Sequence, residues 1–528
     1  MASFLDIRLI GFVVLFVGVC FFPALRRWWK AKNYARGQRV SRKDSTPRKQ
    51  SANSTLRWGN RWLSNDAATE HFLVCGTSGS GKSLIQRLLM KEPLRAIGKI
   101  SGKDSRAVIF DAKNDIEEYL RHIGVSCPIY SFNPFEGGPT ATAWNIAADI
   151  TSSARAMNLA ASLIPSEKGG NNQYFTDAAR QIVTAVVESF IRHSGNSWRF
   201  SDLVSVCINK DAISQTLNRD RQGRAVLDGF FGDERTAFQV FTTVCSRMNY
   251  YRPVAALWKT LPREISIRQW LASDSILILG GLATAKTALD AINEQLFRVL
   301  VEETDVQSNS STRRTYIWID EARLAGPLLK SDLLPFACVK LRSKGVSLVL
   351  SFQDIEGMRE AAGERVANEL VAQMSHKALL RMESDGSSAW AAKQLGQFEA
   401  IEYFASESSS TRSISAQRVV RDSVLASEFY QIIPASKKNG VTGYFISPGQ
   451  TAYRGTVAGN ELQPIVVVES QVQSRFRSEF DQWLNELTAH DLSRLSLNIH
   501  RELPPEKKRL RFAKNEPDKF SMNQIRIP

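Results

Sequence analysis

The residue types with the greatest capacity for chemistry fall in short stretches that each follow an apolar run. The first stretch follows Phe72 to Cys75 and reads Gly76, Thr77, Ser78, Gly79, Ser80, Gly81, Lys82 and Ser83, before a helix-forming run. The spacing G-x-x-x-x-G-K-S is the P-loop pattern, whose glycines let backbone N–H groups cradle phosphates at a helix N-terminus. We therefore predict an ATP site here, in which Lys82 neutralises the terminal phosphates and the Ser83 hydroxyl ligates Mg²⁺.

A pair of adjacent carboxylates, Asp320 and Glu321, follows a second apolar run from Tyr316 to Ile319. Two carboxylates at the end of a strand are costly unless a cation uses them. We predict that Asp320 holds Mg²⁺ through water and that Glu321 is the general base that polarises the attacking water. Asp111 also follows an apolar run, but no second carboxylate adjoins it, so the pair is the better candidate.

Three further polar residues could take part in phosphoryl transfer. Gln353 ends the apolar run Val346 to Phe352, where its amide could sense the terminal phosphate, orient water or simply cap the strand. Arg342 lies eleven residues earlier, and it could reach the nucleotide of a neighbouring subunit as an arginine finger. Arg381 competes for that role, and a solvated basic helix end is the alternative reading of Arg342.

These residues must be positioned by buried strands, and the apolar spacing divides the chain around them. Short apolar runs alternate with helical periodicity and indicate an α/β P-loop core, which we place at residues 57–150 and 266–490. Residues 151–265 repeat apolar residues at helical spacing and predict an inserted all-α domain. Residues 406–415 are expected to form a serine-rich loop.

The chain has 528 residues and a formal net charge of +15, with 43% hydrophobic and 23% charged residues. This composition excludes a mainly disordered, collagen-like or coiled-coil protein. The excess charge is concentrated, because residues 26–50 carry +9 and residues 501–528 carry +4, which leaves +2 for the rest. The charge therefore marks a basic cytoplasmic linker at 26–56 and a basic flexible tail at 491–528, and not a basic body.

Residues 9–25 form an uncharged apolar run of 17 residues, the short end of what a helix needs to cross a bilayer. Ten lysines and arginines follow within residues 26–50, so the positive-inside rule puts the bulk of the chain in the cytoplasm. A cleaved secretory signal is disfavoured because the charge lies on the wrong side and no small-residue cleavage site follows. We predict one N-terminal transmembrane helix within residues 1–25.

An ordered set of segments resembles the conjugative type IV coupling proteins, the TraD/TraG/TrwB-like membrane ATPases. These segments are HFLVCGTSGSGKS, VIFDAKND, NPFEGGPTATAWNI, QYFTDAARQIV, IWIDEA and RSKGVSLVLSFQD. That family has an arginine eleven residues before the glutamine, as Arg342 precedes Gln353. The resemblance covers about residues 57–470. It departs at Asn114, where the family has Gly, at Ile146, where it has Pro, and in the single visible membrane helix, where family members commonly have two.

The resemblance implies a RecA-like motor that uses ATP and Mg²⁺ and assembles as a homo-hexamer at the bacterial inner membrane. Such a motor recruits relaxase-bound single-stranded DNA, or a protein substrate, and feeds it to a type IV secretion channel during conjugation. Two other functions stay open. One is a nucleotide-switched membrane receptor that recruits substrate without translocation, and the other is a DNA translocase of the FtsK/HerA type.

Overall fold

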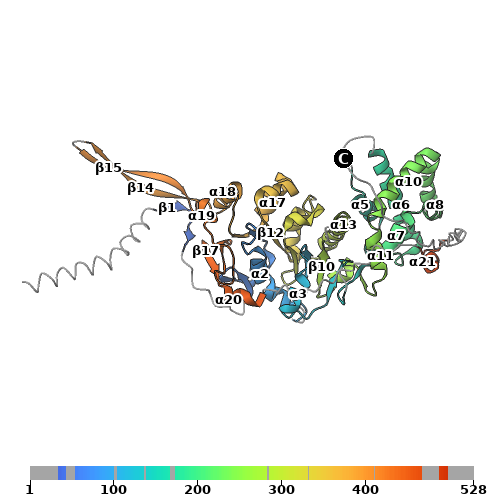
Figure 1. The fold of residues 1–528 in the computed structure, drawn as a ribbon, viewed down its shortest axis with the longest axis horizontal. Coiled ribbons are helices and arrows are strands. Elements are labelled where there is room, and N and C mark those ends of the chain that lie inside the picture. The colour runs from blue at the N-terminus through green and yellow to red at the C-terminus, as the bar shows by residue number, and fades with distance from the viewer. Residues whose placement is uncertain are drawn as a thin grey trace, which may run out of the picture.

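The computed structural model describes residues 34–42, 54–99, 104–135, 138–166, 173–281, 285–330, 332–408, 411–465 and 487–497. The molecule is elongated, with a central sheet flanked by helices, a helical domain at one end and a long β-ribbon at the other (Figure 1). The predicted α/β class with an all-helical domain is therefore confirmed.

A ten-stranded sheet forms the core. Seven neighbouring strands of this sheet, in the order β13-β5-β12-β11-β6-β10-β7, run parallel. The antiparallel hairpin of β16 and β17 extends the sheet beyond β13, and β2 lies at the far edge. The strands are β2 (Val40–Ser41), β17 (Ala452–Val457), β16 (Val441–Ile446), β13 (His376–Leu379), β5 (Phe72–Cys75), β12 (Val346–Phe352), β11 (Arg314–Ile319), β6 (Ser105–Asp111), β10 (Ile276–Gly280) and β7 (Ile129–Ser131).

The parallel strands are mostly apolar because helices cover both faces of the sheet. In β5, Phe72 and Val74 pack into the core on one face, whereas Leu73 and Cys75 pack into the core on the other. The first face is covered by α2 (Lys82–Ala96) and α3 (Ile116–His122), and the second by α13 (Lys286–Asp305), α15 (Leu333–Lys340), α16 (Ile355–Ala362) and α17 (Glu364–Gln373). Because both faces of the sheet are covered, polar side chains that could bind a ligand are found at the ends of the strands.

The helical domain is a bundle whose helices lie in the sequence between strands β7 and β10 of the sheet. Two of its helices begin at an aspartate side chain that caps the first turn. Asp220 Oδ1 accepts the N–H of Gly223 at 2.8 Å, and Asp233 Oδ2 accepts the N–H of Thr236 at 2.8 Å. Its helices are α5 (Ser153–Leu163), α6 (Gln173–Ser194), α7 (Phe200–Cys207), α8 (Lys210–Leu217), α9 (Arg221–Phe231), α10 (Glu234–Asn249) and α11 (Arg252–Lys259).

The last described segment, residues 487–497, lies against this helical domain (Figure 1). Its helix α21 (Ala489–Arg494) is joined to α7 by an ion pair of Arg494 with Asp202, and to α11 by one of Asp491 with Lys259. Residues 491–497 of the predicted basic tail thus pack on the protein, and residues 498–528 lie outside the described residues.

The β-ribbon consists of β14 (Gln397–Ser408) and β15 (Thr411–Asp422), with the short strand β1 (Tyr34–Gly37) along the base of β14. The expectation of a serine-rich loop at residues 406–415 was wrong, since most of these residues lie in the two strands. Every residue from Gln397 to Ser408 has a partner in register, so backbone pairing continues into the serine-rich sequence, which has no regular alternation of apolar residues.

The remaining elements are short connections around the sheet. They are β3 (Leu56–Trp58), β4 (Arg61–Leu63), η1 (Asn65–Thr69), β8 (Ala143–Trp144), α4 (Ile146–Asp149), β9 (Glu264–Ile265), α12 (Ile267–Leu271), η3 (Ala322–Ala325), α14 (Pro327–Lys330), η4 (Leu341–Lys344), α18 (Asp385–Gln394), α19 (Ser427–Tyr430), α20 (Gly459–Leu462) and η5 (Gln463–Ile465).

The predicted transmembrane helix at residues 1–25 lies outside the described residues, as does most of the basic linker. Within the part of the chain that the structure describes, no helix has both the length and the apolar character needed to cross a bilayer.

Candidate active site

The predicted site residues other than Arg342 lie at one edge of the sheet, where three neighbouring parallel strands end. β5 ends at Cys75 directly before the glycine-rich loop, β11 ends at Ile319 before Asp320, and β12 ends at Phe352 before Gln353. The register pairs Cys75 with Phe352. Because the strands are parallel and adjacent, their carboxyl ends bring together side chains that are far apart in the sequence.

The glycine-rich loop requires glycine at several of its positions. Gly79 and Gly81 have φ angles of 73° and 95°, in the left-handed region that residues with a Cβ atom rarely adopt. A Cβ atom on Gly76 would lie 2.7 Å from Ser80 Oγ and 2.8 Å from Leu380 Cβ. The loop therefore has the turned, close-packed backbone that phosphate binding at the start of α2 needs.

The Lys82 side chain lies in this loop. Its Nζ donates to the carbonyl oxygen of Thr77 at 3.2 Å, and only 7% of the residue is exposed. Burial lowers the pKa of Lys82, and the Glu321 carboxylate partly opposes that shift. A second contact anchors the loop, because the Thr77 N–H donates to the carbonyl oxygen of Arg381 at 2.8 Å. An ammonium group is thus held within the turn where phosphates would bind.

Ser83 and Asp320, the predicted Mg²⁺ ligands, lie in contact. Ser83 Oγ donates to Asp320 Oδ2 at 2.9 Å, and Ser351 Oγ donates to Asp320 Oδ1 at 3.2 Å. Lys113 completes the group, since its Nζ lies 2.8 Å from both Ser83 Oγ and Asp320 Oδ2. A hydroxyl and a carboxylate that together hold a cation are the hard oxygen donors that Mg²⁺ prefers, so the residues present fit this metal.

Lys113 is a residue of the site to which the sequence patterns assigned no role. It follows β6, which the sequence could not place beside β11, and only this neighbour relation brings Lys113 to Asp320. A lysine that closely follows a buried parallel strand was the available signal, because such residues gather at the same edge as the P-loop.

Glu321 and Gln353 face each other beside the loop. Gln353 Nε2 donates to Glu321 Oε2 at 3.0 Å. Glu321 has a φ angle of 64° and is only 6% exposed, and its N–H donates to Ser351 Oγ at 3.2 Å. A non-glycine residue in the left-handed region costs about 1–3 kcal/mol and persists only where its surroundings fix it. The backbone is therefore held so that this carboxylate adjoins Asp320.

The two candidate arginines lie at different edges of the sheet. Arg342 precedes β12, and its side chain is 53% exposed and pairs with Glu70 at 3.4 Å. The seven residues of β12 separate it from Gln353, a distance of roughly 20 Å at strand geometry, so Arg342 does not reach the site of its own chain. Arg381 lies beside the P-loop, where its Nη1 pairs with Glu383 at 2.7 Å.

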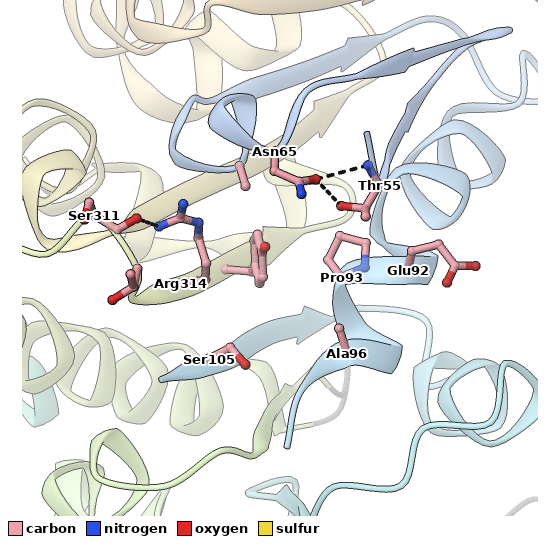
Figure 2. Close-up of a pocket in the computed structure, with 11 residues that line it drawn as sticks. Thr55, Asn65, Glu92, Pro93, Ala96, Ser105, Ser311 and Arg314 are labelled. Carbon is pink, nitrogen blue, oxygen red and sulfur yellow. Dashed lines mark hydrogen bonds between the residues drawn. The ribbon is translucent and has the colours of Figure 1, made fainter. Parts of the chain in front are cut away.

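Two cavities lie near the sheet. One, of about 320 Å³, adjoins the first turn of α2 and is lined by Leu84, Ala435, Ser436, Lys437, Gly459, Leu462 and Gln463. The other, of about 310 Å³, lies at the edge where β6 and β11 begin. Figure 2 shows Asn65 and Thr55 joined on one side of it and Arg314 with Ser311 on the other. Only the first cavity adjoins the P-loop.

Comparison with known proteins gives a consistent result. Residues 61–446 match the sequence family described as the type IV secretion-system coupling protein DNA-binding domain. The fold is similar to that of the bacterial conjugative coupling protein TrwBdeltaN70 in its unbound monoclinic form, with 18% identity, a TM-score of 0.61, and coverage of 84% of this chain and 96% of that chain.

Two further solved structures are similar over the same share of the chain. The plasmid coupling protein TrwB in complex with the non-hydrolysable ATP analogue ADPNP has 17% identity, a TM-score of 0.62, and coverage of 84% of this chain and 97% of that chain. TrwB in complex with ADP and Mg²⁺ has 19% identity, a TM-score of 0.60 and the same two coverages. No curated protein matches the sequence. Because the family match spans more than half of the chain, this protein belongs to the type IV secretion-system coupling proteins.

Proposed function

We propose that this protein is an ATP-hydrolysing coupling protein that moves single-stranded DNA during conjugation. The observation that carries the proposal is the meeting of Lys82 and Ser83 with Asp320 and Glu321 at one sheet edge. Structural relatives named as conjugative coupling proteins, in complex with an ATP analogue or with ADP and Mg²⁺, support it.

The P-loop and Lys82 bind the phosphates in this proposal. The backbone N–H groups of the loop and the Lys82 ammonium offer donors and positive charge to the terminal phosphates. Ser83 and Asp320 are the residues that would hold Mg²⁺, which supplies positive charge beside the phosphate oxygens when bound. The hydrogen bond from Ser351 fixes the Asp320 carboxylate for that task.

Glu321 is the proposed general base, and Gln353 positions it. A carboxylate can accept a proton from an attacking water, provided that it is fixed within reach of that water. The strained Glu321 backbone and the hydrogen bond from Gln353 hold the carboxylate at the edge where the phosphates would bind. Burial of Glu321 limits access of bulk water to this position.

The cavity beside α2 is the proposed place of the ribose and base. It begins at Leu84, the residue after the P-loop serine, and the Ala435 N–H donates to the carbonyl oxygen of Gly79 at 3.1 Å. The segment that closes the cavity is thus bonded to the P-loop itself. At about 320 Å³ the cavity is in the size range of small-molecule sites.

We further propose that the chain assembles as a homo-hexamer, and the position of Arg342 supports contact between neighbouring subunits. Its half-exposed guanidinium lies at the edge opposite its own P-loop, so an arginine finger at this position acts on a neighbouring subunit. Arg381 is the alternative finger. We further propose that the apolar run at residues 9–25 anchors the chain in the bacterial inner membrane as a single span, where it would recruit a relaxase and contact the channel proteins.

ATP turnover by the full-length chain in detergent, with and without single-stranded DNA, tests this function. We expect turnover that rises with DNA and with protein concentration, and a loss of roughly a hundredfold or more in Lys82→Ala and Glu321→Gln. Lys99→Ala, an exposed lysine beyond the far end of α2, is the matched control. Undiminished turnover in either site variant would overturn the proposal. Turnover without any DNA response would favour the receptor function instead.

A further inference from the structure

Lys113 is a cation that shares the two oxygens assigned to Mg²⁺. Its Nζ lies 2.8 Å from Ser83 Oγ and 2.8 Å from Asp320 Oδ2, and these two oxygens lie 2.9 Å apart. The Lys113 side chain is 44% exposed, whereas that of Asp320 is 14% exposed. The ammonium therefore covers the solvent side of a carboxylate that is otherwise enclosed.

The turn that carries Lys113 is held by hydrogen bonds with residues at or after the ends of three strands, β6, β10 and β7. Asp111 at the end of β6 accepts the N–H of Lys113 at 3.1 Å and that of Ile116 at 3.0 Å. Asn114 has a φ angle of 56° and donates through Nδ2 to the carbonyl oxygen of Gly281, which follows β10. The Asn133 side chain, after β7, donates to Asn114 Oδ1 at 3.3 Å. These contacts fix the backbone on both sides of Lys113 and direct it toward Asp320.

The Lys113 ammonium and a divalent cation cannot both occupy the position beside Ser83 and Asp320, because their charges repel. The ammonium neutralises Asp320, and a divalent cation that used the same two oxygens would lie within a few ångströms of it. Two like charges at such a distance repel strongly even at a partly exposed site. The flexible lysine stem lets the ammonium move away, whereas Ser83 and Asp320 are held by helix α2 and by Ser351.

We propose that Lys113 is the resident counter-cation of Ser83 and Asp320, which a divalent cation must displace before it can use these two oxygens. This inference rests on the proposed nucleotide site and assigns Lys113 a positioning role within it. Two consequences follow. Removing the ammonium strengthens the binding of a divalent cation alone. It also weakens the binding of nucleotide without metal, because the phosphates then meet an Asp320 carboxylate whose charge is not neutralised.

The test uses the full-length chain with Lys113→Met and Lys113→Gln, and it measures binding and not turnover. Mn²⁺ binding without nucleotide is followed by electron paramagnetic resonance, and binding of fluorescent ADP is measured in Mg²⁺ and in EDTA. We expect Mn²⁺ to bind roughly fivefold tighter to both variants, the upper end of what displacement of an exposed ion pair costs. We expect the ratio of Kd in EDTA to Kd in Mg²⁺ to rise by roughly tenfold.

Two control variants distinguish an effect of the Lys113 charge from a general effect of removing a lysine. Lys113→Arg keeps the charge and should stay within about threefold of the wild type, and Lys99→Met removes a lysine at the opposite edge and should change neither quantity. Unchanged Mn²⁺ binding in Lys113→Met and Lys113→Gln would overturn the inference. So would an equal loss of ADP binding in Mg²⁺ and in EDTA, since that would make Lys113 a phosphate ligand. Failure of the wild type to bind Mg²⁺ and ADP would instead refute the proposed nucleotide site.

Discussion

Ion pairs of Arg494 and Asp491 attach α21 to the helical domain, and breaking them should release this helix. Arg494 forms a two-pronged pair with Asp202, with Nη1–Oδ2 at 2.6 Å and Nη2–Oδ1 at 2.7 Å. It also contacts Asp491 at 2.9 Å, and Lys259 contacts that carboxylate at 2.6 Å. The Asp202 side chain is 1% exposed and that of Asp491 is 6% exposed. Both carboxylates are therefore enclosed together with their cationic partners.

The pKa of Asp491 reflects this environment. Burial alone would raise it, but hydrogen bonds from Lys259, Thr488 and Arg494 outweigh burial and hold the pKa of Asp491 below its usual range. Removing one partner of a buried ion pair typically costs about 3–5 kcal/mol, because the other charge stays buried without compensation. Since Arg494 is itself 16% exposed, we expect about 2–3 kcal/mol for Arg494→Ala in the free energy of releasing α21.

Hydrogen exchange of residues 489–494 in the full-length chain measures that free energy directly. A double-mutant cycle of Arg494→Ala with Asp202→Asn should give a coupling of about 2 kcal/mol. The asparagine can still accept the Arg199 N–H that Asp202 accepts at 2.7 Å, so the start of α7 is kept. Arg365→Ala breaks an exposed pair with Asp332 and should leave exchange in α21 unchanged. A coupling below about 0.5 kcal/mol would show that the pair of Arg494 with Asp202 does not hold α21 in place.

Three further substitutions probe the sheet edge. Burial raises the pKa of Asp111 to about 6, so the contribution of its protonated form to stability is largest below pH 4 and is lost as pH rises through 6. In denaturant unfolding, the free energy of unfolding of the wild type should therefore fall by about 2 kcal/mol relative to that of Asp111→Asn between pH 4 and 7. Gly81→Ala places a Cβ atom 2.6 Å from Val441 Cγ2 at a φ angle of 95°, and it should abolish ADP binding and lower unfolding free energy by about 1–2 kcal/mol or more; ADP binding within threefold of the wild type would contradict this. Gln353→Ala should lower kcat by roughly ten- to a hundredfold with little change in KM, because Glu321 loses the amide that positions it; unchanged kcat would exclude that role.

Local sequence patterns predicted the parts of the site that each depend on one strand and the turn after it. The P-loop, the Asp320–Glu321 pair and the strand before Gln353 are all where the apolar runs end. The same reasoning also required their meeting, since parallel strands share their carboxyl edge. Whether these residues have the predicted catalytic roles remains a prediction that the variants above test.

What the sequence could not provide was the order of strands and the contacts that cross between domains. Lys113 joins the site only because β6 lies beside β11, and nothing in its local sequence states that. The Arg494–Asp202 pair links residues 292 positions apart, so a charge pattern in a basic tail gave no sign of it. The β-ribbon was missed for a different reason, because its backbone pairing continues into a serine-rich sequence in which apolar residues do not alternate.

The proposed roles of Glu321 in the chemical step and of Lys82 in nucleotide binding can be separated in one comparison. ATP binding and single-turnover hydrolysis are measured on the full-length wild type, Glu321→Gln and Lys82→Ala. We predict that Glu321→Gln binds ATP within about threefold of the wild type but hydrolyses it roughly a hundredfold or more slowly, whereas Lys82→Ala loses binding. Hydrolysis by Glu321→Gln at the wild-type rate would show that Glu321 is not the general base.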